Sequence, residues 1–382
     1  MKQETILLHG GASFDPITGA VSTPIYQSAT FRHPALGEST GYDYSRALNP
    51  TRSVLEKRLA LAEHGGYCLA FSSGMGAISA LVKLFQPGDN MIVSADLYGG
   101  TYRLFSAYYA KYGFSFSWVD TSDFEQVEKN YSPRTKALFI ETPSNPMMKV
   151  TDIRRCADFI HGKGGYLIVD NTFLTPWYQN PLDFGADFVI HSGTKYLAGH
   201  HDALSGFIVH SSDEAEPRLR DAQMSEGAAL APFDGWLTLR GLKTLALRMD
   251  KATANAEVAA FWLRRHPAVE KVFWIGFADH PGYALSQRQS RGAGGMISFY
   301  MKDAAHIPHI LKKVSLVMFA ESLGGTDSLI TYPVVQTHGA IPEAMRLAAG
   351  VNDRLLRLSV GIEDPDDLVA DLDQAFAGFR PA

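Results

Sequence analysis

Lys195 stands in a segment whose neighbours suit covalent chemistry. Residues 189–196 read VIHSGTKY, so an apolar strand pattern ends just before the lysine. A partly desolvated lysine loses its proton more readily than one in water, and its free amine forms a Schiff base with a carbonyl compound. The hydroxyls of Ser192 and Thr194 are placed to hold a phosphate. Because most single lysines lie on the surface, this segment alone does not establish a site.

Asp170 ends a second apolar run, 25 residues before Lys195. Continuous apolar residues such as Leu167–Val169 are typical of a strand buried on both faces of a parallel sheet. Sheets of this kind bind ligands beyond the carboxyl ends of their strands, where Asp170 would meet a cationic ring nitrogen. Taken alone, the residue is better interpreted as a helix cap or a member of a buried salt bridge.

A glycine turn, Ser72–Ala77, follows an apolar run and opens a helical pattern. Backbone N–H groups at the start of a helix bind phosphate, and glycines allow a close approach. The pair Gly74 and Gly76, with Asp96 about twenty residues on, also resembles the start of a dinucleotide fingerprint. The third small position of that fingerprint holds Ser79. An NAD-dependent dehydrogenase is therefore the functional alternative from a different class. The purely structural interpretation is a glycine turn that only packs the helix on the strand.

Together the three segments match the needs of pyridoxal 5'-phosphate (PLP), which are a lysine, a carboxylate for the ring nitrogen and a phosphate cup. His191, His200, His201 and Asp202 have no common metal-ligand spacing. We expect structural roles for them and no metal.

Strand and helix patterns alternate through the first two thirds of the chain, which predicts an α/β fold with a doubly wound sheet. The expected strands are Tyr67–Phe71, Met91–Ser94, Phe114–Val119, Ala137–Ile140, Tyr166–Val169, Phe188–Ile190 and Phe207–Val209. The expected helices begin near Asn49, which would cap a helix, and include Met75–Phe85, Thr101–Tyr112, Ile153–His161 and Trp236–Arg265.

We expect three segments along the chain. Residues 1–49 would form an N-terminal arm, because Gly10–Asn49 has no helical or strand period and its aromatic residues favour docking. Residues 50–245 would form the large domain. Residues 246–382 would form a smaller C-terminal domain with strands Val269–Trp274 and Gly295–Tyr300 and helices Ala304–Val314 and Pro365–Phe376.

Composition narrows the class of protein. The 382 residues carry a formal net charge of -5, which gives no electrostatic case for nucleic acid or an acidic membrane. Two cysteines cannot form a disulfide framework and fit a reducing compartment. The N-terminus lacks the apolar core of a signal peptide, and no apolar run reaches the roughly 18 residues of a membrane span. We expect a cytoplasmic enzyme.

Eight segments carry a stronger signal because they occur together. They are Tyr44–Thr51, Ser73–Met75, Tyr98–Thr101, Glu141–Pro146, Val169–Thr172, His191–Tyr196, Glu321–Gly325 and Arg357–Gly361. On these motifs nearly the whole chain resembles the Cys/Met-metabolism (transsulfuration) family of PLP enzymes. The resemblance implies the aminotransferase-like fold type I, with a mostly parallel sheet in the large domain and a smaller C-terminal α/β domain.

The resemblance also implies roles for residues around the cofactor. Lys195 would be the Schiff-base lysine and main proton shuttle, and Tyr98 would stack on the ring and assist in acid–base work. Asp170 would keep the ring nitrogen protonated, and Asn145 would bond the phenolic oxygen. The remaining cofactor contacts implied are Gly74, Met75, Thr172, Ser192 and Thr194, with Tyr44 and Arg46 reaching the phosphate of a neighbouring subunit.

For the substrate, the resemblance implies that Arg357 takes the α-carboxylate, with Ser322 nearby and Thr337 steadying the arginine. Arg103 would bind a distal carboxylate. Glu321 resembles the pattern of γ-synthases and γ-lyases rather than that of the classical β-lyases.

The reaction that we expect is cystathionine γ-synthase chemistry, which is γ-replacement on O-succinyl- or O-acetylhomoserine with cysteine in methionine biosynthesis. Cystathionine γ-lyase, cystathionine β-lyase and O-acetylhomoserine sulfhydrylase stay open as alternatives. Gly100 stands where methionine γ-lyases carry cysteine, which argues against that branch. Gly193 and Met224 depart from the usual Ala and Asn. The arm implies a homo-oligomer, expected to be a homotetramer of dimers with shared active sites that takes amino-acid substrates.

Overall fold

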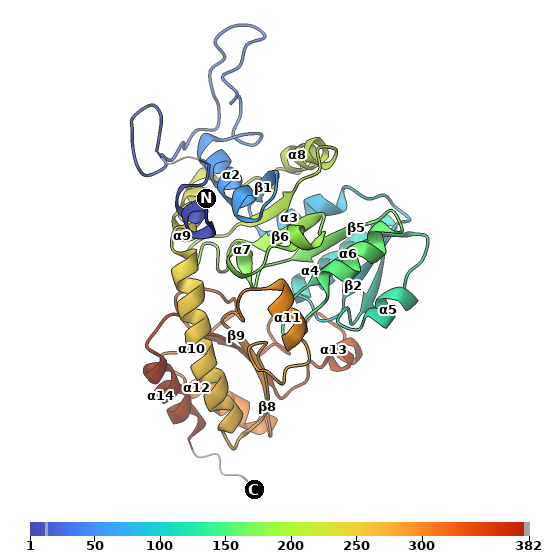
Figure 1. The fold of residues 1–382 in the computed structure, drawn as a ribbon, viewed down its shortest axis with the longest axis vertical. Helices are drawn as coiled ribbons and strands as arrows, with labels where there is room; N and C mark the ends of the chain where they lie inside the picture. The colour runs from blue at the N-terminus through green and yellow to red at the C-terminus, as the bar shows by residue number, and fades with distance from the viewer. Residues whose placement is uncertain (12–13, 378–382) are drawn as a thin grey trace.

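The computed structural model describes residues 1–11 and 14–377. Residues 12–13 of the expected arm and 378–382 of the expected C-terminal domain lie outside the described residues. Two sheets organise the chain, and the long helix α10 (Leu245–Arg265) runs alongside the region between them (Figure 1).

The large sheet has seven strands in the order β1-β7-β6-β5-β4-β2-β3, of which only β7 runs antiparallel to its neighbours. Its strands are β1 (Tyr67–Phe71), β2 (Asn90–Ser94), β3 (Ser115–Val119), β4 (Thr135–Glu141), β5 (Tyr166–Asp170), β6 (Phe188–Ser192) and β7 (Gly206–His210). All seven coincide with expected strands to within two residues at each end. The expected mostly parallel α/β sheet is therefore confirmed.

Both faces of this sheet are buried. Along β4, Leu138 and Ile140 belong to one hydrophobic cluster, while Ala137 and Phe139 belong to another. This alternation follows from the period of two in a strand, and helices cover both faces as in a doubly wound sheet. The helices of this part are α1 (Gln3–His9), α2 (Pro50–Ala62), α3 (Gly74–Val82), α4 (Gly99–Arg103), α5 (Phe124–Lys129), α6 (Ile153–His161), α7 (Thr175–Tyr178), α8 (Ala215–Glu226) and α9 (Pro232–Leu242).

The second sheet has five strands in the order β10-β11-β12-β9-β8 and is antiparallel except between β10 and β11. Its strands are β8 (Val269–Phe273), β9 (Met296–Met301), β10 (Met318–Phe319), β11 (Leu329–Thr331) and β12 (Leu355–Ser359). Helices α10, α12 (Ile307–Lys313) and α14 (Pro365–Phe376) pack together beside it, and α11 (Tyr283–Gln289) and α13 (Glu343–Ala349) complete this part.

Three expected segments differ in detail. The helix expected over Trp236–Arg265 is two helices, because it breaks at Lys243 and Thr244. Arg248 donates to the Gly241 carbonyl at 2.7 Å, a group that a continuous helix would use itself.

The helix expected over Thr101–Tyr112 continues α4 as a π-helical turn, Leu104–Tyr108, followed by a 3-10 turn. The Ser106 hydroxyl donates to the Tyr102 carbonyl at 2.7 Å, a contact that loosens helices locally.

The N-terminal segment holds one helix that we did not expect. Helix α1 packs on α2 and buries Leu7. Between α1 and α2 the chain extends beyond the body of the molecule as two loops (Figure 1, blue).

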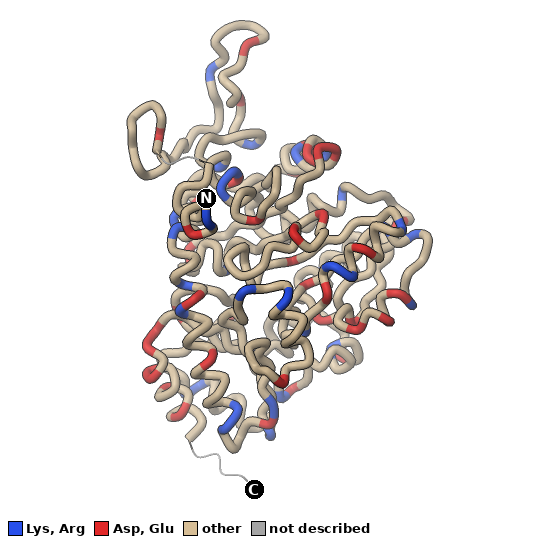
Figure 2. Tube along the Cα trace, in the orientation of Figure 1, with Lys and Arg blue, Asp and Glu red and all other residues tan. Residues whose placement is uncertain are grey.

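Figure 2 shows acidic and basic residues interspersed along the trace. Within the described ranges, no helix combines the length and the apolarity that a membrane span requires.

Candidate active site

A cavity of about 350 Å³ lies at the carboxyl ends of β4, β5 and β6. These parallel strands end in Glu141, Asp170 and Ser192, so their last side chains meet at one edge of the sheet. The second sheet and its loops close the other side. The lining residues are Ser73, Gly74, Met75, Ile78, Tyr98, Thr101, Glu141, Asn145, Asp170, Thr172, Phe173, Ile190, Ser192, Thr194, Lys195, Leu204, Glu321, Ser322, Leu323, Thr337 and Arg357.

Lys195 reaches into this cavity from the turn after β6. Its Nζ donates to the Ser322 hydroxyl at 2.8 Å. Burial and the nearby charge of Arg357 lower the pKa of Lys195 to about 8. The neutral, nucleophilic form of the lysine is therefore far more populated near physiological pH than it is for a lysine in water, although the protonated form still predominates.

Ser322 is held in an unusual conformation at this contact. Its φ is 92°, a left-handed value that costs a non-glycine residue on the order of 1–3 kcal/mol. Its hydroxyl accepts from Lys195 and its carbonyl accepts from Arg357 at 2.8 Å. The strained residue thus joins the two cations of the site.

Asp170 ends β5 with its carboxyl group facing the same cavity. Its Oδ1 accepts the Thr172 backbone N–H at 3.0 Å. Burial raises the pKa of Asp170, while the bonds from Thr172 oppose that shift. A cation placed beside this carboxyl would stabilise its charged form. Thr172 also accepts the Ser192 N–H at 2.9 Å and so ties the ends of β5 and β6 together.

The glycine turn that we expect to hold a phosphate lies where α3 begins, at the edge of the cavity. Ser73 caps the helix by accepting the Gly76 N–H at 3.1 Å. Gly74 and Met75 in the first helical turn line the cavity together with Ser192 and Thr194, and a Cβ on Gly74 would lie 3.2 Å from Ser192. These backbone and hydroxyl donors suit an anion.

Gly193 explains one departure from the usual motif. A Cβ at this position would lie 2.3 Å from both the Phe207 ring and the Ser205 hydroxyl. Neighbouring side chains fill the space that alanine would occupy, so glycine is required here.

Arg357 is almost completely buried on β12, with 1% of its surface exposed. It donates to Asn145 Oδ1 at 2.9 Å, to the Ser322 carbonyl and to the Thr331 hydroxyl at 3.2 Å. All three acceptors are neutral, its Nε has no partner, and no carboxylate in the described chain lies within salt-bridge distance. Such a guanidinium is ready for an incoming carboxylate.

Thr337 lines the cavity, as expected, but its hydroxyl pairs with His338 Nδ1 at 2.8 Å. The hydroxyl that contacts Arg357 belongs to Thr331.

Tyr98 stands at the start of α4 with 41% of its surface exposed. Its backbone N–H donates to Glu141 Oε2 at 3.1 Å. A Cβ on Gly100 would lie 2.3 Å from the Tyr98 ring, so glycine permits the orientation of that ring.

Three expected site residues lie outside the cavity. Arg103 is exposed at the end of α4. Tyr44 and Arg46 are exposed in the projecting segment, where the Arg46 guanidinium lies 5.5 Å from the Tyr44 ring centre and donates to the Met224 carbonyl at 2.6 Å. Met224, whose identity departs from the usual motif, does not line the cavity either.

The sequence reasoning missed eight lining residues, which are Ser73, Ile78, Thr101, Glu141, Phe173, Ile190, Leu204 and Leu323. Glu141 carried the same signal as Asp170, an acid at the end of an apolar strand. The apolar members carried no signal, because a lining apolar residue looks like a core residue in sequence.

A phosphorylated pyridine aldehyde fits this set of groups. The cavity offers an amine, a buried carboxyl, an aromatic ring and an anion cup at separate positions, which matches the functional groups of PLP. Asp96, the acid of the alternative dinucleotide reading, is buried and accepts a hydrogen bond from Ser144.

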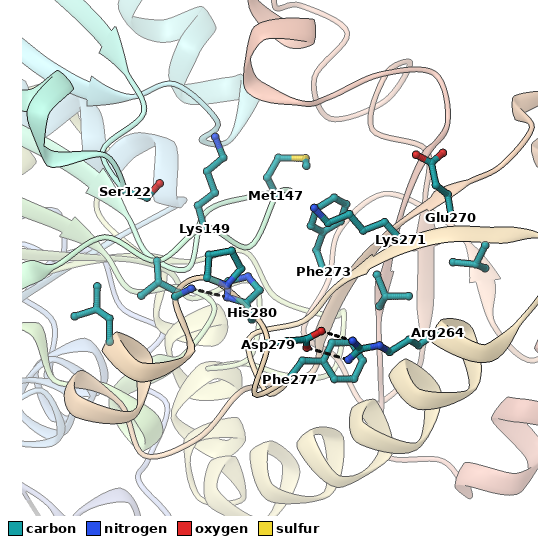
Figure 3. A pocket seen from close by; sticks show the side chains of 16 residues that line it. Ser122, Met147, Lys149, Arg264, Glu270, Lys271, Phe273, Phe277, Asp279 and His280 are labelled. Atoms are coloured by element: carbon teal, nitrogen blue, oxygen red, sulfur yellow. Dashed lines mark hydrogen bonds and ion pairs between the residues drawn. The ribbon is translucent and has the colours of Figure 1, made fainter.

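A second cavity, of about 750 Å³, lies between β8 and the loop after β4 (Figure 3). Most of its charged side chains are already paired. Lys149 pairs with Asp120 at 2.6 Å, Arg264 pairs with Asp279, and Glu270 pairs with Arg354. The larger cavity therefore offers a ligand fewer unpaired charged groups than the smaller one. In the described parts of the chain, no group of three His, Cys, Asp or Glu side chains is arranged to hold a metal ion.

Comparison with known proteins gives one family, described as Cys/Met metabolism PLP-dependent enzyme, which matches residues 4–377. The chain is 48% identical over 378 residues to the cystathionine gamma-synthase of Haemophilus influenzae, covering 99% of this chain and 98% of that protein. It is 47% identical over 375 residues to the cystathionine gamma-lyase of Bacillus subtilis, covering 98% and 99%. Relatives named cystathionine beta-lyase reach 44%.

Solved structures of proteins with related names are also similar to this chain. The crystal structure of cystathionine gamma-lyase from Lactobacillus plantarum complexed with L-serine has a TM-score of 0.96 at 43% identity, covering 99% of both chains.

Proposed function

The chain belongs to the Cys/Met metabolism PLP-dependent enzymes, and from this premise we propose that it is a γ-replacing enzyme that joins cysteine to an O-acylhomoserine. The acyl group leaves the γ-carbon, and the cysteine sulfur forms a bond to that carbon. That the protein is a PLP-dependent transsulfuration enzyme follows from the family, whereas the particular reaction is our proposal.

PLP, when bound, draws electrons from the α-carbon of an amino acid attached to it. Asp170 would hold the proton on the ring nitrogen, which maintains that electron demand. Lys195, once released by the substrate, would take the α-proton on Nζ and return a proton later. Its pKa of about 8 suits both steps, because a general base works best near the operating pH. Ser192, Thr194 and the start of α3 would hold the phosphate.

Arg357 would bind the α-carboxylate of the substrate. Its neutral partners Asn145 and Thr331 keep the guanidinium in place. The substrate carboxylate would then supply the negatively charged partner that the guanidinium lacks. Tyr98 would cover the ring, and Asn145 would also bond the phenolic oxygen of the cofactor.

The observation that carries the choice of reaction is the position of Glu321. It is exposed, lines the cavity and contributes a negative charge that raises the pKa of Lys195. Replacement by cysteine needs a place for the ammonium group of a second amino acid. The Glu321 carboxylate, which lines the same cavity as Arg357, would provide one.

Cystathionine γ-lyase activity is the second candidate, because a relative of that name is nearly as similar as the γ-synthase relative. β-Lyase and O-acetylhomoserine sulfhydrylase activities use the same cofactor residues. The NAD-dependent dehydrogenase has no support from the family.

Product analysis separates these activities. The enzyme is incubated with O-succinyl- or O-acetylhomoserine, each with cysteine or sulfide, and separately with cystathionine. Cystathionine formed from the acyl ester and cysteine supports the proposal. If 2-oxobutyrate or pyruvate from cystathionine is the faster product, the enzyme is a γ-lyase or a β-lyase instead.

The proposal extends to assembly. The segment between α1 and α2 would reach a neighbouring subunit, where Tyr44 and Arg46 would contact the phosphate of its cofactor, in a homotetramer built from dimers. Arg103 would bind the distal carboxylate. The division into residues 1–49, 50–245 and 246–382 belongs to the same proposal.

A further inference from the structure

Two carboxyl groups, one buried and one partly buried, line the active-site cavity on adjacent strands. Glu141 and Asp170 are register partners on the adjacent parallel strands β4 and β5. Neighbouring strands lie about 4.8 Å apart, and partner side chains point to the same face. Glu141 is 6% exposed. Two carboxylates on adjacent strand ends, with one of them buried, repel each other, so their ionised forms compete.

The groups around Glu141 determine which of the two carboxyl groups stays protonated. Its Oε2 accepts the Tyr98 N–H, which within the described residues is the only hydrogen bond of this carboxyl group. Asp96 and Asp170 add negative charge, and Arg357 supplies the opposing positive charge. No cation in the described chain lies within 4.0 Å of Glu141. Asp170, by contrast, has both a backbone N–H and a place beside the ring nitrogen.

We propose that Glu141 is a positioning residue that stays protonated at neutral pH and thereby leaves the charge of Arg357 free for the substrate carboxylate. The proposal rests on the proposed role of Arg357 in binding that carboxylate. An ionised Glu141 would attract the buried guanidinium and repel the incoming anion. A neutral Glu141 still accepts the Tyr98 N–H and anchors the start of α4.

Electrostatics agree with this geometry. Burial and the neighbouring Asp170 hold the pKa of Glu141 well above its usual value. A group with a raised pKa is neutral below that pKa and becomes charged as the pH rises through it. Carboxylate binding at Arg357 should therefore be strong at neutral pH and weaken in alkaline solution.

The first test measures binding of propionate to the holoenzyme as a function of pH. Propionate has a carboxylate but no amine, so it cannot displace Lys195, and the visible absorbance of the cofactor reports its binding. We expect the dissociation constant to rise about tenfold from neutral to alkaline pH, the size of one pK unit of coupling. In Glu141→Gln, which mimics the neutral form, this rise should be lost. A constant that does not change with pH in the wild type, or the same rise in the variant, overturns the proposal.

The second test needs no ligand. Infrared difference spectra of wild type minus Glu141→Gln at neutral pH should contain the C=O band of a protonated carboxyl. Glu56→Gln is the matched control, because Glu56 is also buried but is ion-paired with Arg220 at 2.9 Å, so its difference spectrum should lack the protonated band. A carboxylate band in place of the protonated band refutes the proposal. Neither test depends on which sulfur compound is turned over, so each is independent of the reaction proposed above.

Discussion

The two cavities of the molecule differ in how their charged side chains are paired. The cavity between β8 and the loop after β4 is the larger, at about 750 Å³ against about 350 Å³. Most of its charged side chains already have partners of opposite charge, as Lys149 and Asp120 do. In the smaller cavity, Lys195 and Arg357 contact only neutral oxygen atoms.

The difference has a physical cause. Arg357 is buried and Asp170 is partly buried, and charge is costly in such places, so an unpaired group there binds a complementary ligand strongly. The pairs around the larger cavity are half exposed, and solvent already screens them. The capacity of a cavity to bind a charged ligand therefore depends on buried charged side chains that lack a partner, rather than on the volume of the cavity. Four predictions test this comparison.

The largest effect is expected for Lys195→Ala. The variant loses the group proposed to bond the cofactor and move the α-proton, so kcat should fall by at least about 10³-fold. The visible absorbance of the lysine-bound cofactor should disappear. Steady-state kinetics and an absorbance scan measure both, with circular dichroism as the control for folding. A folded variant that keeps the absorbance and turns over substrate contradicts the assignment.

A smaller effect, mainly on KM, is expected for Arg357→Lys. The lysine keeps a positive charge but loses the fork that binds a carboxylate with two parallel hydrogen bonds. The loss of one charge-assisted hydrogen bond costs about 1.5–3 kcal/mol, so KM should rise roughly tenfold to a hundredfold. An unchanged KM combined with a large fall in kcat would show that Arg357 acts on the chemical step instead.

Cofactor removal tests the unpaired lysine directly. In the cofactor-free protein, Lys195 with a pKa of about 8 is protonated at lower pH and becomes a free amine as the pH rises. The rate of covalent PLP reloading should thus increase about tenfold for each pH unit below 8 and level off above it. Stopped-flow absorbance gives the profile.

Arg357→Gln sharpens that result, because Arg357 is one of the two causes that lower the pKa of Lys195. The midpoint of the reloading profile should move to higher pH in this variant. A midpoint that stays in place would leave burial as the sole cause.

The sequence alone indicated which residues at the ends of the large sheet's strands line the cavity. Asp170, Ser192 and Lys195 follow apolar strands, and the edge of a parallel sheet brings strand ends together wherever they occur in the chain. The same rule identifies Glu141 once β4 is extended by one residue beyond the expected Ala137–Ile140.

The contribution of the second sheet and its loops was harder to predict. β12 holds Arg357 between leucines in the sequence LLRLS, yet no strand was expected there. The partner of Arg357, Thr331, comes from the adjacent strand β11, a pairing that only the three-dimensional register reveals. The left-handed backbone of Ser322 also has no sequence signal, because glycine would be the expected residue at that φ. The break between α9 and α10 depends on the long-range packing of Arg248.

The smallest effect is expected in the larger cavity, for Arg264→Gln. Arg264 pairs with Asp279 and lies over the Phe277 ring at 4.5 Å, with 44% of its side chain exposed. Removing a solvent-screened pair should leave kcat/KM and the thermal midpoint within experimental error. Arg357→Gln is the matched comparison, since it makes the same substitution where the guanidinium is buried and unpaired. If Arg264→Gln instead lowers kcat/KM as strongly, pairing does not separate the two cavities, and the larger one participates in catalysis.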